Sequence, residues 1–349
     1  MRIAQVSPLY ESVPPKLYGG TERVVSYLTE ALVKQGHEVT LFASGDSVTK
    51  AKLISPCANA LRLDNNCIDS LAHHILMLEQ VFQRAQEFDI IHFHIDYIHY
   101  PLCRRCFTPT LTTLHGRLDI KDYGFLFSEF KETPVVSISN AQRKPFPWLN
   151  WQATVYHGLP KNLHEFHEKP GKYLAFLGRI SPEKRPDRAI KIAEKAGMEL
   201  KIAAKVDKAN KEYFDTVIKP MLKSRLVKFV GEINEKEKEE FLGNAYALVF
   251  PIDWPEPFGL VMIEAMACGT PVIAWRCGSV PEVIEHEKTG FIVESIEEAV
   301  KAVEKIPYIS RKTCRQRFEK KFTAERMAMD YLAVYEKVIS EKRPLLKAV

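Results

Sequence analysis

Two glutamates stand eight positions apart in the stretch WPEPFGLVMIEAMACGTPVIA, residues 254–274. Glu256 lies between two prolines, which restrict the backbone and remove amide donors, so we expect it in an extended turn. A helix is predicted to begin near Gly259, run through 260–267 and end at Gly269. Glu264 would lie about one turn into this helix. The two carboxylates would therefore face different parts of one extended ligand.

The start of this helix is itself a candidate binding group. The amides of Phe258, Gly259 and Leu260 lack intrahelical partners and would point toward an anion or a ligand hydroxyl. Taken alone, Glu264 could instead be an exposed first-turn acid that the helix dipole stabilises. A glycosidase pair is disfavoured, because its two carboxylates flank one bond at about 5–9.5 Å.

Cations and glycines occur in two other strand-to-helix loops. GRISPEKRP, residues 178–186, places Arg179 and Lys184 after a predicted strand, where fixed cations suit a diphosphate. YGGTERVV, residues 18–25, places Gly19 and Gly20 before the first predicted helix, where backbone amides can approach a phosphate closely. Residues 178–186 could alternatively be a solvated basic loop. Residues 18–25 indicate a phosphate site only weakly when taken alone.

Polar side chains also follow predicted strands in the first half. LTTLHG ends in His115, and HFHID places His92, His94 and Asp96 on one strand face by alternation. These three could bind a metal, but hydrogen bonds are the favoured interpretation for polar groups in a buried strand. SISNAQR offers Ser139 or Asn140 as a helix cap, again at the carboxyl end of a strand.

The bulk composition is that of a soluble two-domain protein. The chain has 349 residues, 46% of them apolar, and no apolar run long enough to cross a membrane. The start of the chain lacks the features of a signal peptide, and seven scattered cysteines fit reduced thiols, so we expect a cytoplasmic protein. CRRC, residues 103–106, is the only close cysteine pair, and nothing beside it supports a redox or zinc role.

Charge is distributed unevenly along the chain. Lys and Arg balance Asp and Glu in residues 1–155, so the rest carries the whole formal charge of +5. No dense basic stripe with interleaved aromatics is present, which disfavours nucleic acid as a partner. A neutral first half disfavours strong membrane attraction, although Trp148 and Trp151 could make a peripheral contact or stack on a sugar. The charge distribution fits better with sites for anionic small molecules in the second half of the chain.

Alternating strand and helix patterns predict two α/β domains. In the first half, strands are expected at 2–6, 37–43, 89–95, 110–115 and 134–139, with helices at 21–35 and 71–85. After a polar stretch at 157–171 the pattern restarts with strands at 173–180, 198–206 and 247–253 and a helix at 186–197. We expect two doubly wound parallel sheets facing a cleft, with a boundary near residue 165.

The terminal stretch is strongly helical, with an apolar face that includes Met327, Tyr331 and Tyr335. This helix, within 323–349, is expected to leave domain 166–322 and to pack on domain 1–165, and its alternative role is that of the last helix of domain 166–322. Both arrangements fit the sequence.

The motifs together resemble the retaining glycosyltransferases of family 4, which have the GT-B fold. The matching stretches, in the same order, are the early GG loop, LHG, GRISPEK, the E-x7-E of EPFGLVMIEAMACGTPVIA, and GSVPEVIEHEKTGFIV at 278–293. The resemblance covers nearly the whole chain. It implies two Rossmann-like domains, the second holding most of a nucleotide-sugar donor and the first facing the acceptor.

The resemblance also implies roles for individual residues. Glu256 would bind donor-sugar hydroxyls, the amides of Phe258, Gly259 and Leu260 would meet sugar and phosphate, and Glu264 would hold the ribose. Arg179, Lys184 and the Gly19–Gly20 loop would meet the diphosphate, and His115 would lie beside the reacting sugar, with His94, Asp96 and Ser139 on the acceptor side. Family members often carry a glycine where this chain has Ala204 and Lys205, so Lys205 could add a phosphate or base contact or be a solvated strand end.

The implied activity is hexose transfer to a hydroxyl acceptor with retention, without a cofactor or a metal. UDP-hexose is the favoured donor from its frequency in the family. A same-fold epimerase or sugar phosphorylase, and a catalytically inactive nucleotide-sugar-binding protein, remain alternatives. A dehydrogenase would need a tight glycine fingerprint, which the sequence lacks.

Overall fold

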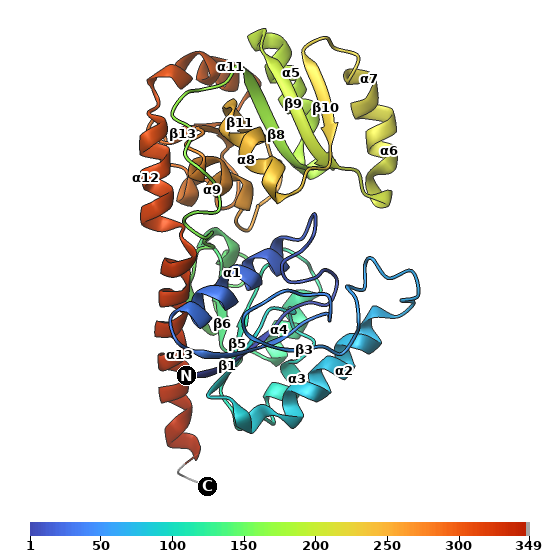
Figure 1. Cartoon of the computed structure of the whole chain (residues 1–349), viewed down its shortest axis with the longest axis vertical. Helices are drawn as coiled ribbons and strands as arrows, with labels where there is room; N and C mark the ends of the chain where they lie inside the picture. Colours follow the sequence, from blue (N-terminus) through green and yellow to red (C-terminus); the bar gives the residue numbers. More distant parts are fainter. Residues whose placement is uncertain (347–349) are drawn as a thin grey trace. The chain divides into compact units, whose positions relative to one another are not determined.

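The computed structural model describes residues 1–346, with side chains described as far as Lys342. The chain divides into two compact units. Unit 1 consists of residues 1–160 together with the helix that begins at Ala324, and unit 2 runs from Lys161 to Thr323. Each unit is built around one parallel β-sheet with helices between most successive strands (Figure 1). The sequence prediction of two parallel-sheet α/β domains is confirmed.

The sheet of unit 1 has seven strands in the order β3-β2-β1-β4-β5-β6-β7. All neighbouring pairs are parallel. The chain order reverses between β1 and β4, and the carboxyl ends of strands beside such a point are where open α/β sheets bind ligands. The strands are Arg2–Val6 (β1), Glu38–Phe42 (β2), Lys52–Ile54 (β3), Ile90–Phe93 (β4), Thr110–Thr113 (β5), Val135–Ser137 (β6) and Trp151–Thr154 (β7).

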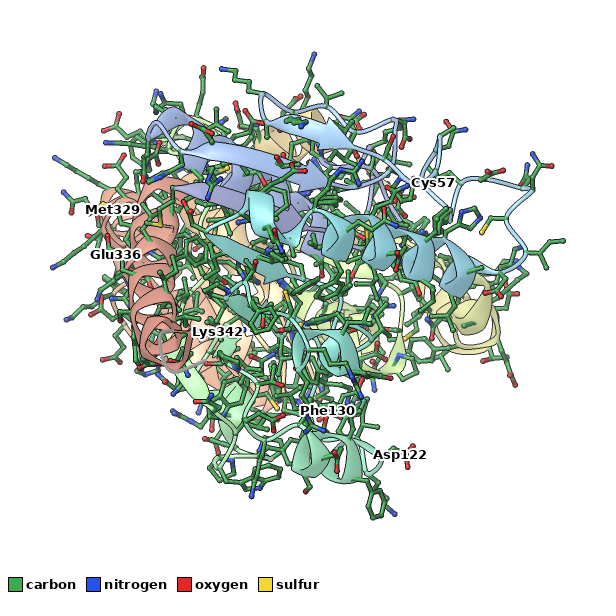
Figure 2. All side chains as sticks on the ribbon, turned by 90° about the horizontal axis from the view of Figure 1, so that it is seen from below. Cys57, Asp122, Phe130, Met329, Glu336 and Lys342 are labelled. Carbon is green, nitrogen blue, oxygen red and sulfur yellow. The ribbon has the colours of Figure 1, made fainter. Side chains whose placement is uncertain are left out.

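Five helices accompany this sheet: α1 (Gly20–Lys34), α2 (Ser70–Gln83), α3 (Tyr100–Cys103), α4 (Tyr123–Glu129) and α13 (Ala324–Leu346). The terminal helix α13 packs against α1 and β5, so it belongs to unit 1. Its apolar face is buried, whereas Met329 and Glu336 are exposed on the opposite side (Figure 2). Lys342, also labelled in Figure 2, donates hydrogen bonds to the carbonyls of Cys106 and Thr108 at 2.8 and 3.1 Å.

The sheet of unit 2 has six strands in the order β10-β9-β8-β11-β12-β13. The strands are Tyr173–Arg179 (β8), Glu199–Lys205 (β9), Val227–Gly231 (β10), Ala245–Phe250 (β11), Val272–Trp275 (β12) and Gly290–Val293 (β13). The main helices are α5 (Pro186–Ala196), α8 (Glu235–Gly243), α9 (Leu260–Ala267), α11 (Ile296–Lys305) and α12 (Arg311–Lys321), and shorter ones are α6 (Lys211–Tyr213), α7 (Lys219–Met221) and α10 (Val280–Val283). The predicted helix 260–267 is confirmed.

Three details differ from the sequence prediction. Strands β3, β7, β12 and β13 are absent from it; β3 has three residues, β7 is only half-buried, and β12 and β13 have four residues each. Strand β4 ends at Phe93, so alternation does not carry Asp96 onto the face of His92 and His94, and Asp96 instead has a left-handed φ of 54°. Trp151 lies in β7 and donates to the Phe146 carbonyl at 3.0 Å, so this indole has a structural partner.

No helix within residues 1–346 is both long and apolar enough to cross a membrane. All seven cysteines lie in the described part of the chain, and none forms a disulfide.

Candidate functional site

The loop between β11 and α9 carries the first group of candidate residues. Gly259 precedes α9 with a left-handed φ of 78°, and a Cβ at this position would lie 3.1 Å from the Phe250 ring. In the described part of the chain, no side chain caps the start of α9. The helix therefore presents the partial positive charge of its first turn, where the amides of Phe258 and Leu260 also lie.

Glu256 is held directly before this helix by two polar partners. Lys184 forms an ion pair with its carboxylate, and the Trp254 indole donates a hydrogen bond to the same carboxylate at 3.0 Å. The Lys184 ammonium also lies 4.9 Å from the centre of the Trp254 ring. Only 8% of Glu256 is exposed, so the carboxylate is largely desolvated and fixed in direction.

Further contacts join the loop of Glu256 to the loop of Lys184. The amide of Asp253 donates to the Glu183 carbonyl at 2.8 Å. The Asp253 carboxylate pairs with Arg185 at 2.7 Å and with Arg188 at 3.1 Å. The β8–α5 and β11–α9 loops therefore form one polar surface at the carboxyl ends of two neighbouring strands.

Gly278 and Ser279, which were not predicted individually from the sequence, lie against the backbone of the Glu256 loop. A Cβ on Gly278 would lie 2.3 Å from the Glu256 carbonyl oxygen and 2.4 Å from its amide nitrogen. Ser279 donates from its amide to the Glu256 carbonyl at 3.0 Å and from its hydroxyl to the Phe258 carbonyl at 2.7 Å. The stretch GSVPEV thus fixes the backbone of the Glu256 loop.

Arg179 and Lys205 end two neighbouring strands. They are register partners in β8 and β9, and both approach the carboxylate of Asp207, at 3.7 and 3.3 Å. Arg179 also lies 3.5 Å from Glu183. The two predicted cations are therefore brought together, and both have acidic partners.

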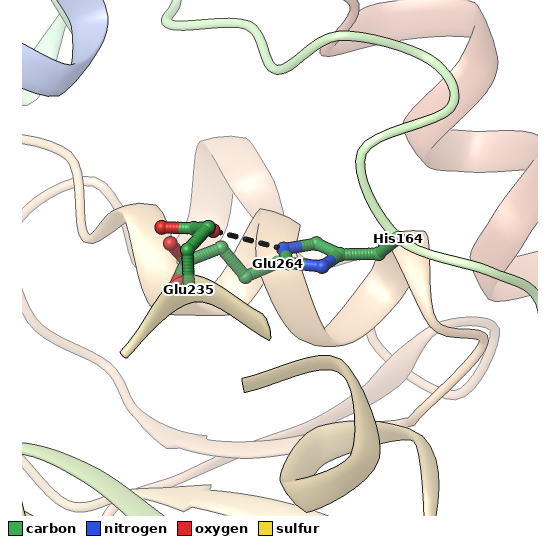
Figure 3. Close-up of side chains that lie close together, drawn as sticks. All are labelled: His164, Glu235 and Glu264. Atoms are coloured by element: carbon green, nitrogen blue, oxygen red, sulfur yellow. Dashed lines mark ion pairs between the residues drawn. The ribbon is translucent and has the colours of Figure 1, made fainter. Parts of the chain in front are cut away.

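Glu264 belongs to a second cluster, which Figure 3 shows with His164 and Glu235. It is 3% exposed, so it is not the exposed first-turn acid that the sequence allowed. Lys238, on α8, lies 2.8 Å from Glu264 and 3.3 Å from Glu235. His164 lies 3.6 Å from Glu235, and burial lowers the pKa of this imidazole.

The same cluster has the residue types of a metal site. Ligand atoms of His164, Glu235 and Glu264 lie within 4.8 Å of one another. The Lys238 ammonium, however, already contacts both carboxylates and supplies the charge that a metal would bring. We therefore interpret the cluster as an ion-pair network that orients Glu264. The sequence does not mark Lys238 as a site residue, because its stretch, EKEKEEF, is typical of a solvated helix.

In unit 1, His115 follows β5 and meets His94, which follows the neighbouring strand β4. Nδ1 of His94 lies 2.8 Å from Nε2 of His115, and the His115 ring stacks on His157 with centroids 5.3 Å apart. Burial lowers the pKa of His115 to about 3 and holds the pKa of His94 well below its usual range. Both imidazoles are therefore neutral at physiological pH.

Gln142 fixes the backbone around His115 and is not marked by any sequence pattern. Its side-chain amide donates to the carbonyls of Leu114 and Gly116, both at 2.8 Å. The predicted cap Ser139 accepts a hydrogen bond from the Gln142 amide at 3.1 Å, at the start of a short 3-10 turn. Ser139 thus lies near the His115 loop through Gln142.

The remaining unit 1 candidates lie apart from this contact. Gly19 is buried, and a Cβ there would lie 2.7 Å from the Pro15 side chain. Gly20 is exposed and begins α1, which no described side chain caps. Asp96 is exposed beyond the end of β4.

Family models match both units of the chain. The model described as "Glycosyl transferases group 1" matches residues 161–321, and "Glycosyltransferase Family 4" matches residues 18–156. An uncharacterized glycosyltransferase of Methanocaldococcus jannaschii is 25% identical over 84% of this chain and 85% of its own length. A D-inositol 3-phosphate glycosyltransferase of Mycolicibacterium smegmatis is 32% identical over 35% of this chain and 29% of its own.

Solved structures show the same fold. A sucrose-phosphate synthase from Thermosynechococcus elongatus has a TM-score of 0.79 at 19% identity, covering 97% of this chain and 99% of that one. The Anabaena protein HepE, solved in complex with UDP and glucose, has a TM-score of 0.73 at 16% identity, covering 97% and 100%. The GT-B fold expected from the sequence is confirmed.

Proposed function

Because the chain belongs to the family 4 glycosyltransferases with the GT-B fold, we propose that it is a retaining hexosyltransferase. It takes a hexose from a UDP-sugar and transfers it to a hydroxyl acceptor. The donor assignment is supported by HepE, whose structure contains UDP and glucose.

The observation that carries the proposal is the Lys184–Glu256 pair beside the uncapped start of α9. A carboxylate that is already oriented can accept hydrogen bonds from two sugar hydroxyls without the entropic cost of ordering its own side chain. The helix start and Lys184 favour the negative diphosphate next to that sugar. In this assignment the amides of Phe258, Gly259 and Leu260 bind sugar and phosphate.

Other residues bind the remaining parts of the donor. Glu264, which Lys238 orients, accepts hydrogen bonds from the ribose hydroxyls. Arg179 and Lys205 end adjacent strands, and they reach the diphosphate by exchanging their Asp207 partner for phosphate oxygens. Unit 1 has candidate groups of its own, since the Gly19–Gly20 loop offers backbone amides to an anion and His115 offers a ring nitrogen to a hydroxyl group.

Catalysis in this proposal needs no protein nucleophile. Negative charge grows on the diphosphate as the glycosidic bond breaks, and Lys184, Arg179 and the start of α9 stabilise that charge in the transition state. The acceptor hydroxyl attacks from the face of the leaving group and passes its proton to the departing phosphate, which gives retention. In this proposal these cations do the work that a divalent ion would do, so the reaction needs no metal.

Slow hydrolysis of the donor tests the reaction without knowledge of the acceptor. UDP-glucose is incubated with the protein in EDTA, and proton NMR follows the anomeric signal of the first product. We expect UDP release with α-glucose formed first. A β-configured first product, or a strict requirement for manganese, would contradict the proposal.

A further inference from the structure

A continuous chain of hydrogen bonds in unit 1 leads from helix α13 to His115. The Gln5 amide group donates to the Tyr335 hydroxyl at 2.9 Å, and its carbonyl oxygen lies 2.8 Å from Nε2 of His94. Nδ1 of His94 in turn lies 2.8 Å from Nε2 of His115. Tyr335 is thus connected to His115 through two intervening side chains.

The sheet explains why these groups meet. Gln5 in β1 and His92 in β4 are register partners, and His94 is two positions further along, so the three side chains share one face. Tyr331 and Tyr335 are one turn apart on α13, so they lie on the same side of that helix. Helix α13 packs on β5 and covers this face (Figure 1).

The structure orients the Gln5 amide with its nitrogen toward Tyr335 and its oxygen toward His94, and this orientation gives the chain of hydrogen bonds its direction. The amide oxygen can only accept, so Nε2 of His94 must carry the hydrogen. A neutral imidazole carries one hydrogen, so Nδ1 of His94 is an acceptor and Nε2 of His115 must donate to it. Nδ1 of His115 is then left with a lone pair.

A second branch has the same direction. Since Tyr335 accepts from Gln5, its own hydrogen goes to Nδ1 of His92 at 2.8 Å. Nε2 of His92 then donates to the Thr113 hydroxyl at 2.7 Å, and Thr113 pairs with Tyr331 at 2.9 Å. Each histidine in both branches is the Nε2–H tautomer.

Water cannot rearrange this chain easily. Gln5, His92, Thr113, Tyr331 and Tyr335 are fully buried, and His94 is 2% exposed. A buried donor without a partner costs more than a normal hydrogen bond contributes, so the members must keep one consistent order. Burial also keeps the pKa values of His92 and His94 well below their usual range, so neither carries a second hydrogen.

We propose that Gln5 and Tyr335 are positioning residues that fix His115 as the Nε2–H tautomer and leave Nδ1 as its only acceptor. His115 therefore accepts a hydrogen bond from a hydroxyl group of its ligand and does not donate to phosphate oxygens from Nδ1. This consequence for ligand choice rests on the proposed function, whereas the tautomer does not.

Nitrogen-15 NMR of histidine-labelled protein at pH 7.5 tests the tautomer directly, because protonated and unprotonated ring nitrogens have well-separated shifts. His115→Gln identifies the signals of that ring. We expect Nδ1 of His115 to be unprotonated, with this tautomer at least about tenfold over the other, as the cost of an unmade buried hydrogen bond implies. A hydrogen on Nδ1 would overturn the proposal.

Two tyrosines of α13 provide a matched pair of variants. Tyr335→Phe removes the acceptor that orients the Gln5 amide, so His115 should populate both tautomers. Tyr331→Phe removes an equally buried hydroxyl at the far end of the second branch, beyond Thr113 and His92, so the tautomer of His115 should not change. Equal spectra for His115 in the two variants would overturn the role of Tyr335.

A third variant tests the same contact in case Tyr335→Phe does not fold. Gln5→Met removes both amide contacts and keeps a side chain of similar length, and it should give the same tautomer mixture. Since none of these spectra requires a substrate, a failure of the tautomer assignment is distinguishable from a failure of the glycosyltransferase assignment. If His115 shows the fixed tautomer but the protein does not hydrolyse the donor, the proposed function is wrong and the tautomer assignment stands.

Discussion

Glu256 illustrates what can be read from single residues in this sequence. The Pro-Glu-Pro turn and the eight-residue spacing to Glu264 mark both carboxylates as candidates from the amino-acid pattern alone. Their partners Lys184 and Lys238 differ in this respect. The loop GRISPEKRP marks Lys184, whereas nothing in the local pattern marks Lys238, because its contact joins α8 to α9.

Replacing Glu256 by Gln tests the residue at the centre of the proposed sugar site. The change removes a charge-assisted interaction and leaves Lys184 without its carboxylate partner, so we expect a loss of about 1.5–3 kcal/mol in transition-state stabilisation. Donor hydrolysis should then fall roughly 10–100-fold in kcat/KM. Selectivity among UDP-hexoses should also decrease.

Glu183→Gln is the matched control for Glu256→Gln. Glu183 lies in the adjoining loop and pairs with Arg179 at 3.5 Å, but it is more exposed. We expect a change of less than about threefold in kcat/KM, since such pairs contribute little. Equal losses in the two variants would show that Glu256 has no special part in the reaction.

At the scale of elements, apolar runs predict the central strands and the helix 260–267 well. The edge strands β3 and β7 escape such a prediction because their patterns are short and only partly apolar, so pairing with a neighbour decides their structure. The contacts of Gly278 and Ser279 with the Glu256 loop cannot be predicted from such patterns for a similar reason. They depend on the close approach of two loops about twenty residues apart in the chain.

Gly278→Ala tests these contacts. A Cβ at this position would collide with the backbone of Glu256, and the left-handed φ of 55° adds about 1–2 kcal/mol of strain. We expect lower stability and a loss of donor hydrolysis beyond what the folded fraction explains, measured by thermal unfolding and by kinetics on the same samples.

Gly197→Ala separates backbone strain from the contact with Glu256. Gly197 also has a left-handed φ, of 64°, at the end of α5, but a Cβ there meets nothing within 4 Å. It should lose about 1 kcal/mol of stability and keep wild-type kcat. If Gly278→Ala behaves in the same way, its contact with the Glu256 loop is unimportant for activity.

At the scale of the whole molecule, the two units differ in their buried histidines. Burial lowers the pKa of seven histidines in the described part of unit 1, namely His37, His74, His92, His94, His99, His115 and His157. In the described part of unit 2, His164 is the histidine with a lowered pKa. The restart of the α/β pattern predicts two sheets, but not this contrast, because burial of a histidine depends on tertiary packing.

This contrast predicts that acid destabilises unit 1 more than unit 2. The unfolded histidines bind protons below pH 6.5, whereas the buried ones stay neutral until a lower pH, about 3 for His115. The free energy of unfolding should therefore fall as the pH decreases below 6.5, by up to about 1.4 kcal/mol per pH unit for each such histidine.

Tryptophan fluorescence can report the two units separately. Trp148 and Trp151 belong to unit 1, and Trp254 and Trp275 belong to unit 2. In variants that keep one pair, urea midpoints at pH 7.5 and 5.5 should differ more for the unit 1 pair. Equal shifts for the two pairs would contradict the prediction.

The central claim is that unit 2 binds a uridine diphosphate sugar through Glu264 and the start of α9. Calorimetric titration of UDP into the protein in EDTA tests it most directly, with Glu264→Gln beside the exposed control Glu297→Gln. We predict saturable binding by the wild type and the control, and an affinity roughly 10–100-fold weaker for Glu264→Gln, as the loss of a charge-assisted hydrogen bond implies. Absence of UDP binding by the wild type, or equal affinities in all three proteins, would contradict the account.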